Sequence, residues 1–500
     1  MRKIKFLFGA RLHITMIASI LIAGGAAAKL PNILLITADD MNRDSVGVYG
    51  CPVEATTPNI DQLASEGIQF DYAYVPISLC TPSRHVMLSG SYSHQTLTRS
   101  FTELERVGPA LPDLLKENGY TIANINKQPS HYDWDTALTE KESSRGRNVP
   151  FHYNAVKNII ETSGEKPWFI MANFNDPHRP FYASEAEKKS KNYQNIDMST
   201  PTRVYTPDEV CVPGFLPDLP EVRMEMAQYY SSVRRADDGV GAVLKALEES
   251  GQAADTIVVF LSDHGISMPF SKMNCYQTSL RVPFIVRYPG HVDAEKRDQV
   301  HVVSTVDLAP TLLELTGLDV PKTMAGRSFL PLLENGVQDN RDHMVGYYYR
   351  NLGQNRMFPE FVVHMRDWVY VYNPWVDGVT EVHNSDYTGS PSLLAMWAAT
   401  EYFPSIKKRV NFHKYRIMEE LYNVRQDPNS YVNLAGEEEY QQRVQSMRQL
   451  LVEWMEQTDH PALELMKDPL NKKLIAKYMA WEKENAIEQL RQKKESRKKK

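Results

Sequence analysis

Acidic residues directly follow two apolar segments of this 500-residue sequence, and their chemistry suits a metal ion. Asp39 and Asp40 follow the run NILLIT, while Asp263 and His264 follow the run TIVVFL. Two adjacent carboxylates after a buried strand repel each other unless a cation compensates their charge. Carboxylate oxygens suit Ca²⁺ or Mg²⁺ better than Zn²⁺. The pattern therefore predicts a hard divalent metal held by Asp39, Asp40 and Asp263, with His264 or one of its neighbours.

A cysteine stands at the predicted entrance of a helix in the stretch SLCTPSRHVML. We expect Pro82 at the first helical position, which places Cys80 beside free backbone N–H groups and the positive end of the helix dipole. Arg84 adds a guanidinium fork suited to an oxyanion. A bare thiol there would have a lowered pKa and could act as a nucleophile. A soft thiolate suits a hard metal poorly, so Cys80 either stands apart from the metal or is not a thiol in the working protein.

The elements that must position these residues follow from short apolar runs separated by helical patterns. Buried parallel strands are predicted at 32–37, 121–125, 168–174, 256–261 and 284–287, and helices at 57–67, 111–119 and within 221–251. This alternation is typical of the α/β class, in which a mostly parallel sheet is covered by helices on both faces. Ligands of such sheets bind at the carboxyl ends of the strands, so the polar groups after these runs are expected to converge.

The pattern changes in the last third of the chain. A long, irregular, aromatic stretch is followed by the strand-like segment KYRIMEELYNV and by a predicted helix at 437–457. We expect residues 29–360 to form a catalytic domain, 361–480 a smaller C-terminal subdomain, and 481–500 a basic tail that is helical or disordered.

The first 28 residues have the composition of a secretory signal peptide. Four cations precede an apolar run at 14–23, and small residues at 26–28 offer a cleavage site. Loss of these cations changes the formal net charge from -6 to -10, which argues against a nucleic-acid partner. No sequon for N-glycosylation occurs, so we expect an exported bacterial protein, periplasmic or secreted, without stable membrane insertion after cleavage.

The stretch CTPSR resembles the C/S-x-P-S-R signature of the type I sulfatases, whose first residue is oxidised after translation to formylglycine. In chain order PNILLITADD, TPNIDQLASEG, CTPSRHVMLSG, NDPHRPF, IVVFLSDHG and RVPFIVRYPG also resemble that family. The resemblance implies an alkaline-phosphatase-like α/β fold, with a large mixed, mostly parallel sheet flanked by helices. It further implies a smaller C-terminal subdomain with a short antiparallel sheet. An oxygen derivative of Cys80 would also resolve its mismatch with a hard metal.

The resemblance implies roles at matched positions. Formylglycine from Cys80 would join the ligands of a Ca²⁺ ion, with Mg²⁺ as the alternative; the protein ligands would be Asp39, Asp40, Asp263 and His264. Arg84 would stabilise the alkoxide of the nucleophile and Lys127 would bind the sulfo group. His178 would protonate the leaving atom.

Two substrate contacts and one departure complete the implied site. Lys272 stands where a sulfate-binding lysine is expected, and His364 belongs to the subdomain that often closes over the substrate. The family commonly has Gly-Lys-x-His, whereas here Pro129 occupies the position of that histidine. His131 is the nearest replacement, and it is either catalytic or an ordinary surface histidine.

Three segments resemble the heparan N-sulfatases more than the arylsulfatases or the iduronate 2-sulfatases: NDPHRPF, SDHGISMPFSKMNCY and ELYNVRQDPNSYVNLA. This implies hydrolysis of the N-sulfate of glucosamine in heparan-type saccharides. The alternatives are an O-sulfatase for another sulfated polysaccharide, a phosphodiester or phosphonate hydrolase of the same superfamily, or a glycan-binding protein without activity. The implied partners are a sulfated saccharide and a maturation enzyme, either formylglycine-generating or anaerobic sulfatase-maturating; the sequence predicts no oligomeric state.

Overall fold

The computed structural model describes residues 29–99, 106–129, 131–138, 146–190, 198–351, 356–382 and 387–499. The predicted signal peptide, residues 1–28, lies outside these segments. From Pro31 onward the chain forms one unit. Within the described segments no helix is both long enough and apolar enough to cross a membrane.

The described residues form a large sheet of eight strands in the order β4-β3-β5-β1-β6-β7-β2-β8. Its strands are β1 (Asn32–Asp39), β2 (Ile68–Tyr74), β3 (Thr121–Ile125), β4 (Thr136–Leu138), β5 (Trp168–Pro177), β6 (Thr256–Ser262), β7 (Phe284–Arg287) and β8 (Lys296–Ser304). Every residue of β1, β5 and β6 is buried, as expected for central strands covered on both faces. The predicted mixed, mostly parallel α/β sheet is confirmed.

The direction of one strand in this sheet differs from the prediction. The segment β7 was expected to be parallel, but it pairs antiparallel with both β6 and β2. A parallel crossover needs a connection that crosses a face of the sheet, usually as a long helix. The connection from β6 to β7 contains only the short helix α8 (Gln277–Leu280), so the chain returns beside β6 in the opposite direction.

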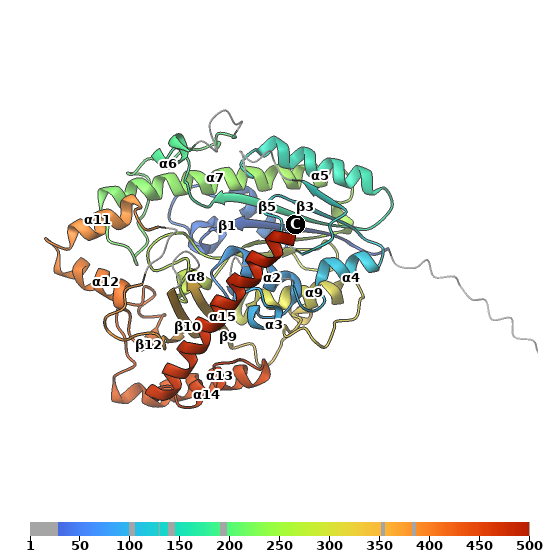
Figure 1. Ribbon diagram of the computed structural model, residues 1–500. Helices are drawn as coiled ribbons and strands as arrows, with labels where there is room; N and C mark the ends of the chain where they lie inside the picture. The colour runs from blue at the N-terminus through green and yellow to red at the C-terminus, as the bar shows by residue number, and fades with distance from the viewer. Residues whose placement is uncertain are drawn as a thin grey trace, which may run out of the picture. The chain divides into compact units, whose positions relative to one another are not determined.

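Helices cover both faces of the large sheet (Figure 1). On one face α5 (Val149–Ser163) and α7 (Pro220–Glu249) pack against each other and against β5, and α1 (Pro58–Ser65) packs on α7. On the other face lie α2 (Cys80–Ser89), α4 (Leu111–Glu117) and α9 (Leu308–Leu315). The shorter helices are α3 (Ser93–Thr96), α6 (Glu185–Lys189) and α10 (Leu330–Leu333).

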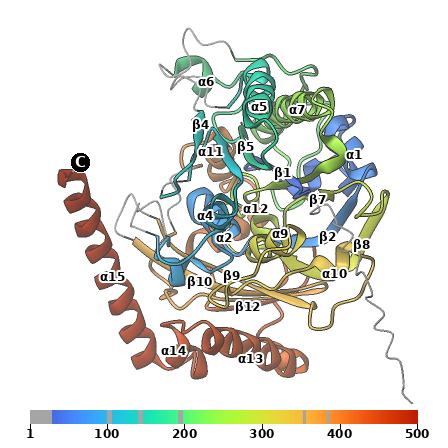
Figure 2. The same ribbon diagram turned by 90° about the vertical axis from the view of Figure 1, so that its right-hand side faces the viewer.

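A second, antiparallel sheet has the order β12-β11-β10-β9 in the described residues. Its strands are β9 (His343–Asn351), β10 (Arg356–Met365), β11 (Trp368–Tyr372) and β12 (Glu419–Asn423). Figure 2 shows this sheet between α2 and α9 on one side and α13 (Gln441–Gln457) and α14 (Leu463–Lys467) on the other. The expected short antiparallel sheet is therefore present, and its first strand begins before residue 361.

The remaining helices lie in the C-terminal part of the chain. They are α11 (Pro391–Ala399), which packs on α7, α12 (Pro404–Tyr415) and α15 (Lys472–Lys499). The helix α15 includes most of the predicted basic tail and is fixed to the body by an ion pair of 2.5 Å between Arg99 and Glu482. The two members of this pair are buried, so the first turns of α15 belong to the packed molecule.

Candidate active site

Two neighbouring strands bring the acidic residues together. Strands β1 and β6 are parallel, and their register pairs Ala38 with Ser262. The residues that follow, Asp39 and Asp40 on one strand and Asp263 and His264 on the other, therefore lie at the same edge of the sheet. Ligating atoms of all four residues lie within 4.8 Å of one another, and all four residues are buried.

The chain turns back sharply after His264, and this turn delivers a lysine to the same cluster. A Cβ atom at Gly265 would lie 1.8 Å from the carbonyl oxygen of Thr278, so only glycine fits this approach. The backbone N–H of Gly265 donates to Ser279. The loop that is closed in this way carries Lys272, whose Nζ lies 2.9 Å from Oδ1 of Asp40.

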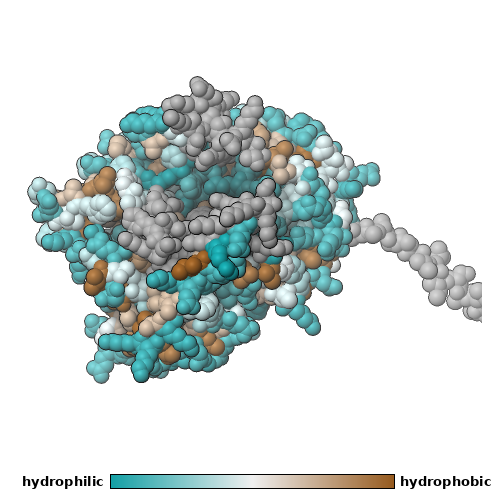
Figure 3. Space-filling view, viewed as in Figure 1, coloured by the Kyte–Doolittle hydropathy of each residue, from teal (hydrophilic) through white to brown (hydrophobic). Residues whose placement is uncertain are grey.

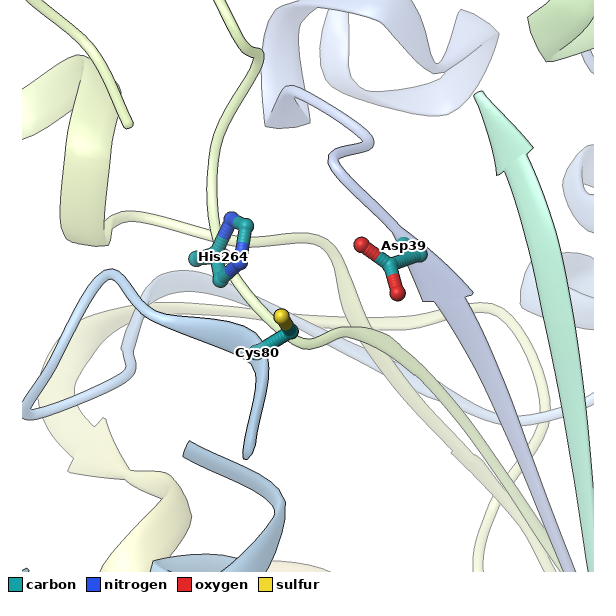
Figure 4. A group of neighbouring side chains, drawn as sticks. All are labelled: Asp39, Cys80 and His264. Atoms are coloured by element: carbon teal, nitrogen blue, oxygen red, sulfur yellow. The ribbon is translucent and has the colours of Figure 1, made fainter. Parts of the chain in front are cut away.

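Helix α2 begins two residues earlier than the sequence analysis predicts. Leu79 is the N-cap and Cys80 the first helical residue, so Pro82 is the third. A proline is tolerated there because the N–H groups of the first helical turn have no partner inside the helix. The helix ends at Ser89 and is capped by Gly90, which has a φ of 61° and donates its backbone N–H to the carbonyl oxygen of Val86. Figure 4 shows the Cys80 thiol pointing toward the space between Asp39 and His264.

The thiol of Cys80 is not activated in the unmodified chain, contrary to the expectation of a lowered pKa. Burial raises its pKa to about 12, and the charge of Asp39 contributes to the rise, whereas Lys272 opposes it. Desolvation of the thiolate thus outweighs the helix dipole and the nearby cations. A bare cysteine at this position would be a protonated thiol at neutral pH.

The guanidinium of Arg84 joins the two acidic strand ends. Its Nε donates to Oδ2 of Asp263 over 3.1 Å, and its Nη2 lies 3.4 Å from Oδ2 of Asp39. Its Nη1 donates to the side chains of Thr37 and Asn173. The side chain is buried, so these bonds fix both its position and that of the carboxylates.

Sequence reasoning missed Asn173 as part of this network. Its side-chain oxygen accepts from Thr37 over 2.6 Å and from Arg84 over 2.5 Å, and its Nδ2 donates to Asn124 over 3.0 Å. Asn173 is a polar residue within the otherwise apolar run WFIMANF, and it is fully buried in the structure. Because buried polar groups need partners, its place in that run was the signal that could have identified it.

The donor atoms of the acidic cluster fit a metal ion. Oδ1 of Asp39 and Nε2 of His264 are buried and have no hydrogen-bond partner among the described residues. Burial lowers the pKa of His264, and its Nδ1 faces the carbonyl oxygen of Gly265 at 3.1 Å, so Nε2 keeps a lone pair. Burial alone would raise the pKa of Asp39, but the charges of Lys127, His178 and Arg84 hold it well below its usual range. Both side chains are therefore in the protonation state that a cation requires.

Lys127 connects the acidic cluster to an open cleft. Its Nζ lies 2.6 Å from Oδ2 of Asp39, and the side chain is partly exposed. Asn126 and Lys127 have φ values of 56° and 41°, and Asp40 has a φ of 69°. Such left-handed conformations are unfavourable for residues other than glycine and are concentrated at functional sites. The strained backbone at this edge of the sheet therefore agrees with a functional site there.

His178 lines the same cleft and is held by a buried ion cluster that the sequence did not reveal. Nδ1 of His178 lies 2.6 Å from the carbonyl oxygen of Arg179, so Nδ1 carries the hydrogen. Arg147 donates to the carbonyl oxygen of His178 over 2.7 Å and to Oδ1 of Asp176 over 2.9 Å. Arg235 contacts the same carboxylate. No local pattern marked Arg147 or Arg235, because they come from distant segments.

The cleft has a volume of about 1050 Å³. Its lining includes Lys127, His178, Arg179, Glu225 and Gln228 together with parts of the segments 180–190 and 388–391. On the face drawn in Figure 3 the surface is hollowed near the centre, and the side chains visible there are mostly hydrophilic. A cleft of this size, with charged and polar side chains such as Lys127, His178 and Gln228 in its lining, can hold a saccharide.

Two of the expected site residues lie elsewhere. His131 is exposed and does not line the cleft. His364 is fully buried; its Nε2 lies 2.9 Å from the carbonyl oxygen of Cys275, and its ring stacks on Tyr74. Burial lowers the pKa of His364 to about 4. In this structure His364 is a packing residue between the two sheets, not the substrate contact expected from the sequence.

Comparison with known proteins agrees with the geometry of the site. Residues 31–318 match the Sulfatase family, and residues 263–378 match the family described as N-sulphoglucosamine sulphohydrolase, C-terminal. Human N-sulphoglucosamine sulphohydrolase is 30% identical over 485 residues, which covers 89% of this chain and 93% of that protein. An ulvan-active sulfatase of Formosa agariphila is 27% identical and covers 85% of this chain and 74% of its own length.

The fold has a close match among solved structures. One protein, solved in complex with its substrate D-glucosamine-2-N,6-O-disulfate, has a TM-score of 0.64 and 21% identity, with coverage of 87% of this chain and 99% of that chain. The family match covers more than half of the sequence and contains both strand ends of the acidic cluster. The chain therefore belongs to the sulfatase family and is a hydrolase of sulfate esters or sulfamates.

Proposed function

We propose that this sulfatase removes the N-sulfo group of glucosamine at the non-reducing end of heparan-type saccharides. The observation that carries the proposal is the 30% identity to human N-sulphoglucosamine sulphohydrolase, which extends over nearly the full length of both chains. The match of residues 263–378 to the C-terminal family of that enzyme supports it. This second match includes Lys272 and the first three strands of the small sheet.

We further propose that Cys80 is converted to formylglycine and that Asp39, Asp40, Asp263 and His264 hold a divalent metal, Ca²⁺ with Mg²⁺ as the alternative. Three carboxylates in close proximity form a hard donor set, and Oδ1 of Asp39 and Nε2 of His264, which have no hydrogen-bond partner among the described residues, are donors for such an ion. When present, the aldehyde hydrate supplies an oxygen nucleophile in place of sulfur, and the metal supplies positive charge at the sulfo group.

The residues of the chain itself position the sulfo group between three cations. Arg84 is fixed at the base of the site by Asp263 and Asp39, and it presents positive charge beside Cys80. Lys127 reaches from the cleft to Asp39, and Lys272 reaches Asp40 from the loop after β6. Together these cations compensate the negative charge of the sulfo oxygens, which a low-dielectric site makes more effective.

His178 is the proposed proton donor to the leaving nitrogen. Its Nδ1 hydrogen is engaged by the carbonyl oxygen of Arg179, which leaves Nε2 as the ring atom that transfers a proton. An amine leaves poorly as an anion, so protonation of the nitrogen is needed before or during cleavage of the N–S bond. The contact between Arg147 and the carbonyl oxygen of His178 keeps the imidazole at the wall of the cleft.

We also propose that the protein is exported and acts in the periplasm or outside the cell. The cationic and apolar composition of residues 1–28 supports this proposal. Exported enzymes meet extracellular glycans directly, which agrees with a saccharide substrate.

The second candidate function is hydrolysis of an O-sulfate. The 27% identity to an ulvan-active sulfatase favours it, because that relative is named for activity on a different sulfated polysaccharide. His178 could protonate an alkoxide as well as an amine, so the proton donor does not distinguish the two reactions.

The decisive experiment measures sulfate release from defined heparan fragments by protein that has been produced together with a maturation enzyme. Fragments that carry only N-sulfate are compared with fragments that carry only 6-O-sulfate, and an aryl sulfate and a phosphodiester are tested in parallel. We expect release from the N-sulfated fragment and none by the Cys80→Ala variant. Release from the 6-O-sulfated fragment alone would refute N-sulfate specificity while sparing the family assignment.

A further inference from the structure

We propose that a second pocket, lined by arginines and separate from the active-site cleft, binds a sulfo group of a saccharide chain. This basic pocket has a volume of about 800 Å³. Arg43, Arg281, Arg366 and Arg425 line it, together with the aspartates Asp44 and Asp367. It shares no lining residue with the cleft, and it contains none of the residues proposed to bind the metal or to act in the reaction.

Three of the four arginines form no ion pair with a carboxylate in the part of the chain that the structure describes. Arg43 pairs with Asp44 and Asp71 at 2.9 and 3.2 Å. Within the described segments of the chain, no ion pair joins Arg281, Arg366 or Arg425 to an acidic side chain. The guanidinium groups around one pocket repel one another, and an anion in the pocket would add to the compensation that Asp44 and Asp367 in the lining supply.

Arg281 is the most constrained of these cations. Its Nε donates to the backbone oxygen of Asp71 over 2.7 Å, and its guanidinium lies 4.6 Å from the centre of the Tyr72 ring. Burial lowers the pKa of this guanidinium, but the group stays positively charged. The two Nη groups make no hydrogen bond to any described residue, so the fixed fork is available to a ligand in the pocket.

The pocket lies where the two sheets meet. Arg281 follows α8, and its backbone forms a bridge with Tyr74 at the end of β2. Arg366 lies in the turn between β10 and β11, and Arg425 lies just after β12. The backbone N–H of Val424 donates to the carbonyl oxygen of Asp367 over 2.9 Å, which holds these two exposed arginines at one end of the small sheet.

The chemistry of the lining selects an anion with several oxygens. A guanidinium fork binds such groups through two parallel hydrogen bonds, and a tetrahedral sulfo group offers three oxygens. Four arginines face only two aspartates here, whereas the chain as a whole has a formal charge of -6. The assignment of the anion to a saccharide rests on the proposed function. A longer sulfated chain carries other sulfo groups beside the one that the enzyme removes.

The inference is tested by calorimetric titration in the Cys80→Ala background, which prevents turnover. The ligands are a sulfated heparan hexasaccharide, the same hexasaccharide without sulfate, and inorganic sulfate. The double variant Arg366→Gln/Arg425→Gln is compared with Lys157→Gln/Arg491→Gln, which removes the same charge from exposed positions outside the pocket. Both arginines of the first variant are exposed, so it should fold normally.

We expect the first variant to bind the sulfated hexasaccharide about tenfold more weakly than the second variant, because charge-assisted hydrogen bonds are lost. The unsulfated hexasaccharide should show no such difference. Equal affinity of the two double variants for the sulfated chain would overturn the inference. A loss seen with inorganic sulfate but not with the hexasaccharide would overturn the assignment to a saccharide.

Two further measurements keep the inference separate from the proposed function and from folding. Matured Arg366→Gln/Arg425→Gln enzyme should hydrolyse a sulfated monosaccharide with unchanged kcat/KM, because such a substrate reaches only the cleft. If no variant hydrolyses N-sulfate, the proposed function fails, but the binding difference is still measurable. Arg281→Lys keeps the charge and removes the guanidinium fork, so folded Arg281→Lys protein should bind the sulfated hexasaccharide severalfold more weakly. Unchanged binding would contradict a role for the fork.

Discussion

Replacement of Asp176 by asparagine should lower both the stability of the protein and the turnover that depends on His178. The carboxylate of Asp176 is buried and accepts from Arg147 over 2.9 Å and from Arg235 over 3.1 Å. Arg147 also donates to the carbonyl oxygen of His178. Asparagine has the same shape but no charge, so the change removes the anion that two buried guanidinium groups share.

The size of the effect follows from this geometry. Removal of one partner from a buried ion pair costs about 3–5 kcal/mol of unfolding free energy. Glu187 remains 3.2 Å from Arg235, and Arg147 keeps the carbonyl oxygens of His178 and Pro180, so the loss should lie near the lower limit of that range. Misplacement of a reacting group by about 1 Å reduces turnover by as much as about 100-fold. We therefore expect kcat to fall by about 10- to 100-fold.

The assay combines urea unfolding with kcat on the N-sulfated fragment. Asp307→Asn is the matched control, because Asp307 forms a buried ion pair of 2.5 Å with Arg341 and lies outside the lining of the cleft. This control should lose stability but keep its kcat. A loss of stability in Asp176→Asn without a fall in kcat would refute the argument that the ion cluster positions His178.

Three further predictions concern the metal, a buried carboxyl group and the proton donor. Dialysis against a chelator should abolish sulfate release and Ca²⁺ should restore it; full activity in protein shown to be metal-free by elemental analysis would contradict the metal site. Burial raises the pKa of Glu360 from 4.5 to about 7, so its contribution to stability is complete below pH 4.5 and is lost as the pH rises through 7. Glu360→Gln should therefore flatten the decline in unfolding free energy over this range by about 3 kcal/mol, and a decline equal to that of the unmutated protein would contradict it. His178→Gln should reduce hydrolysis of the sugar sulfamate more than that of an aryl sulfate, whose leaving group needs no proton, and equal losses in kcat would argue against the proton transfer.

The positions of the acidic cluster could be predicted because they depend on local sequence and a general property of parallel sheets. Uniformly apolar runs identified β1 and β6 as central strands, and the polar residues after them fell at one edge of the sheet. The predicted bounds of β3 are those of the structure, since turn residues delimit this strand on both sides. Family motifs placed Arg84 and Lys127 in the same region, and the structure brings both to Asp39.

Features that depend on distant contacts could not be predicted in this way. The direction of β7 depends on the path of the chain after β6, which periodicity does not encode. The pKa of Cys80 depends on how deeply the folded protein buries the thiol. A prediction from the helix dipole and the nearby arginine alone therefore expected a lowered pKa where the structure raises it. The buried packing of His364 against Tyr74 is a contact between the two sheets that no motif records.

The residues that hold His178 in position are a second feature of the site that the sequence could not predict. The motif NDPHRPF identified the histidine, but its position depends on Arg147, which lies just before α5, and on Arg235, which lies in the middle of α7. An arginine before or within an ordinary helix gives no local sign of an interior ion pair. Such residues become visible only when the folded structure shows which carboxylate they meet.

The most direct test of the central claim is the mass of the peptide that contains Cys80, measured in purified protein that releases sulfate. The account predicts that this peptide carries an aldehyde in place of the thiol, because an oxygen derivative suits the carboxylate-rich site and the thiol is held protonated. The fraction of aldehyde should rise in proportion to specific activity across preparations. A peptide that is entirely thiol in fully active enzyme would contradict the account.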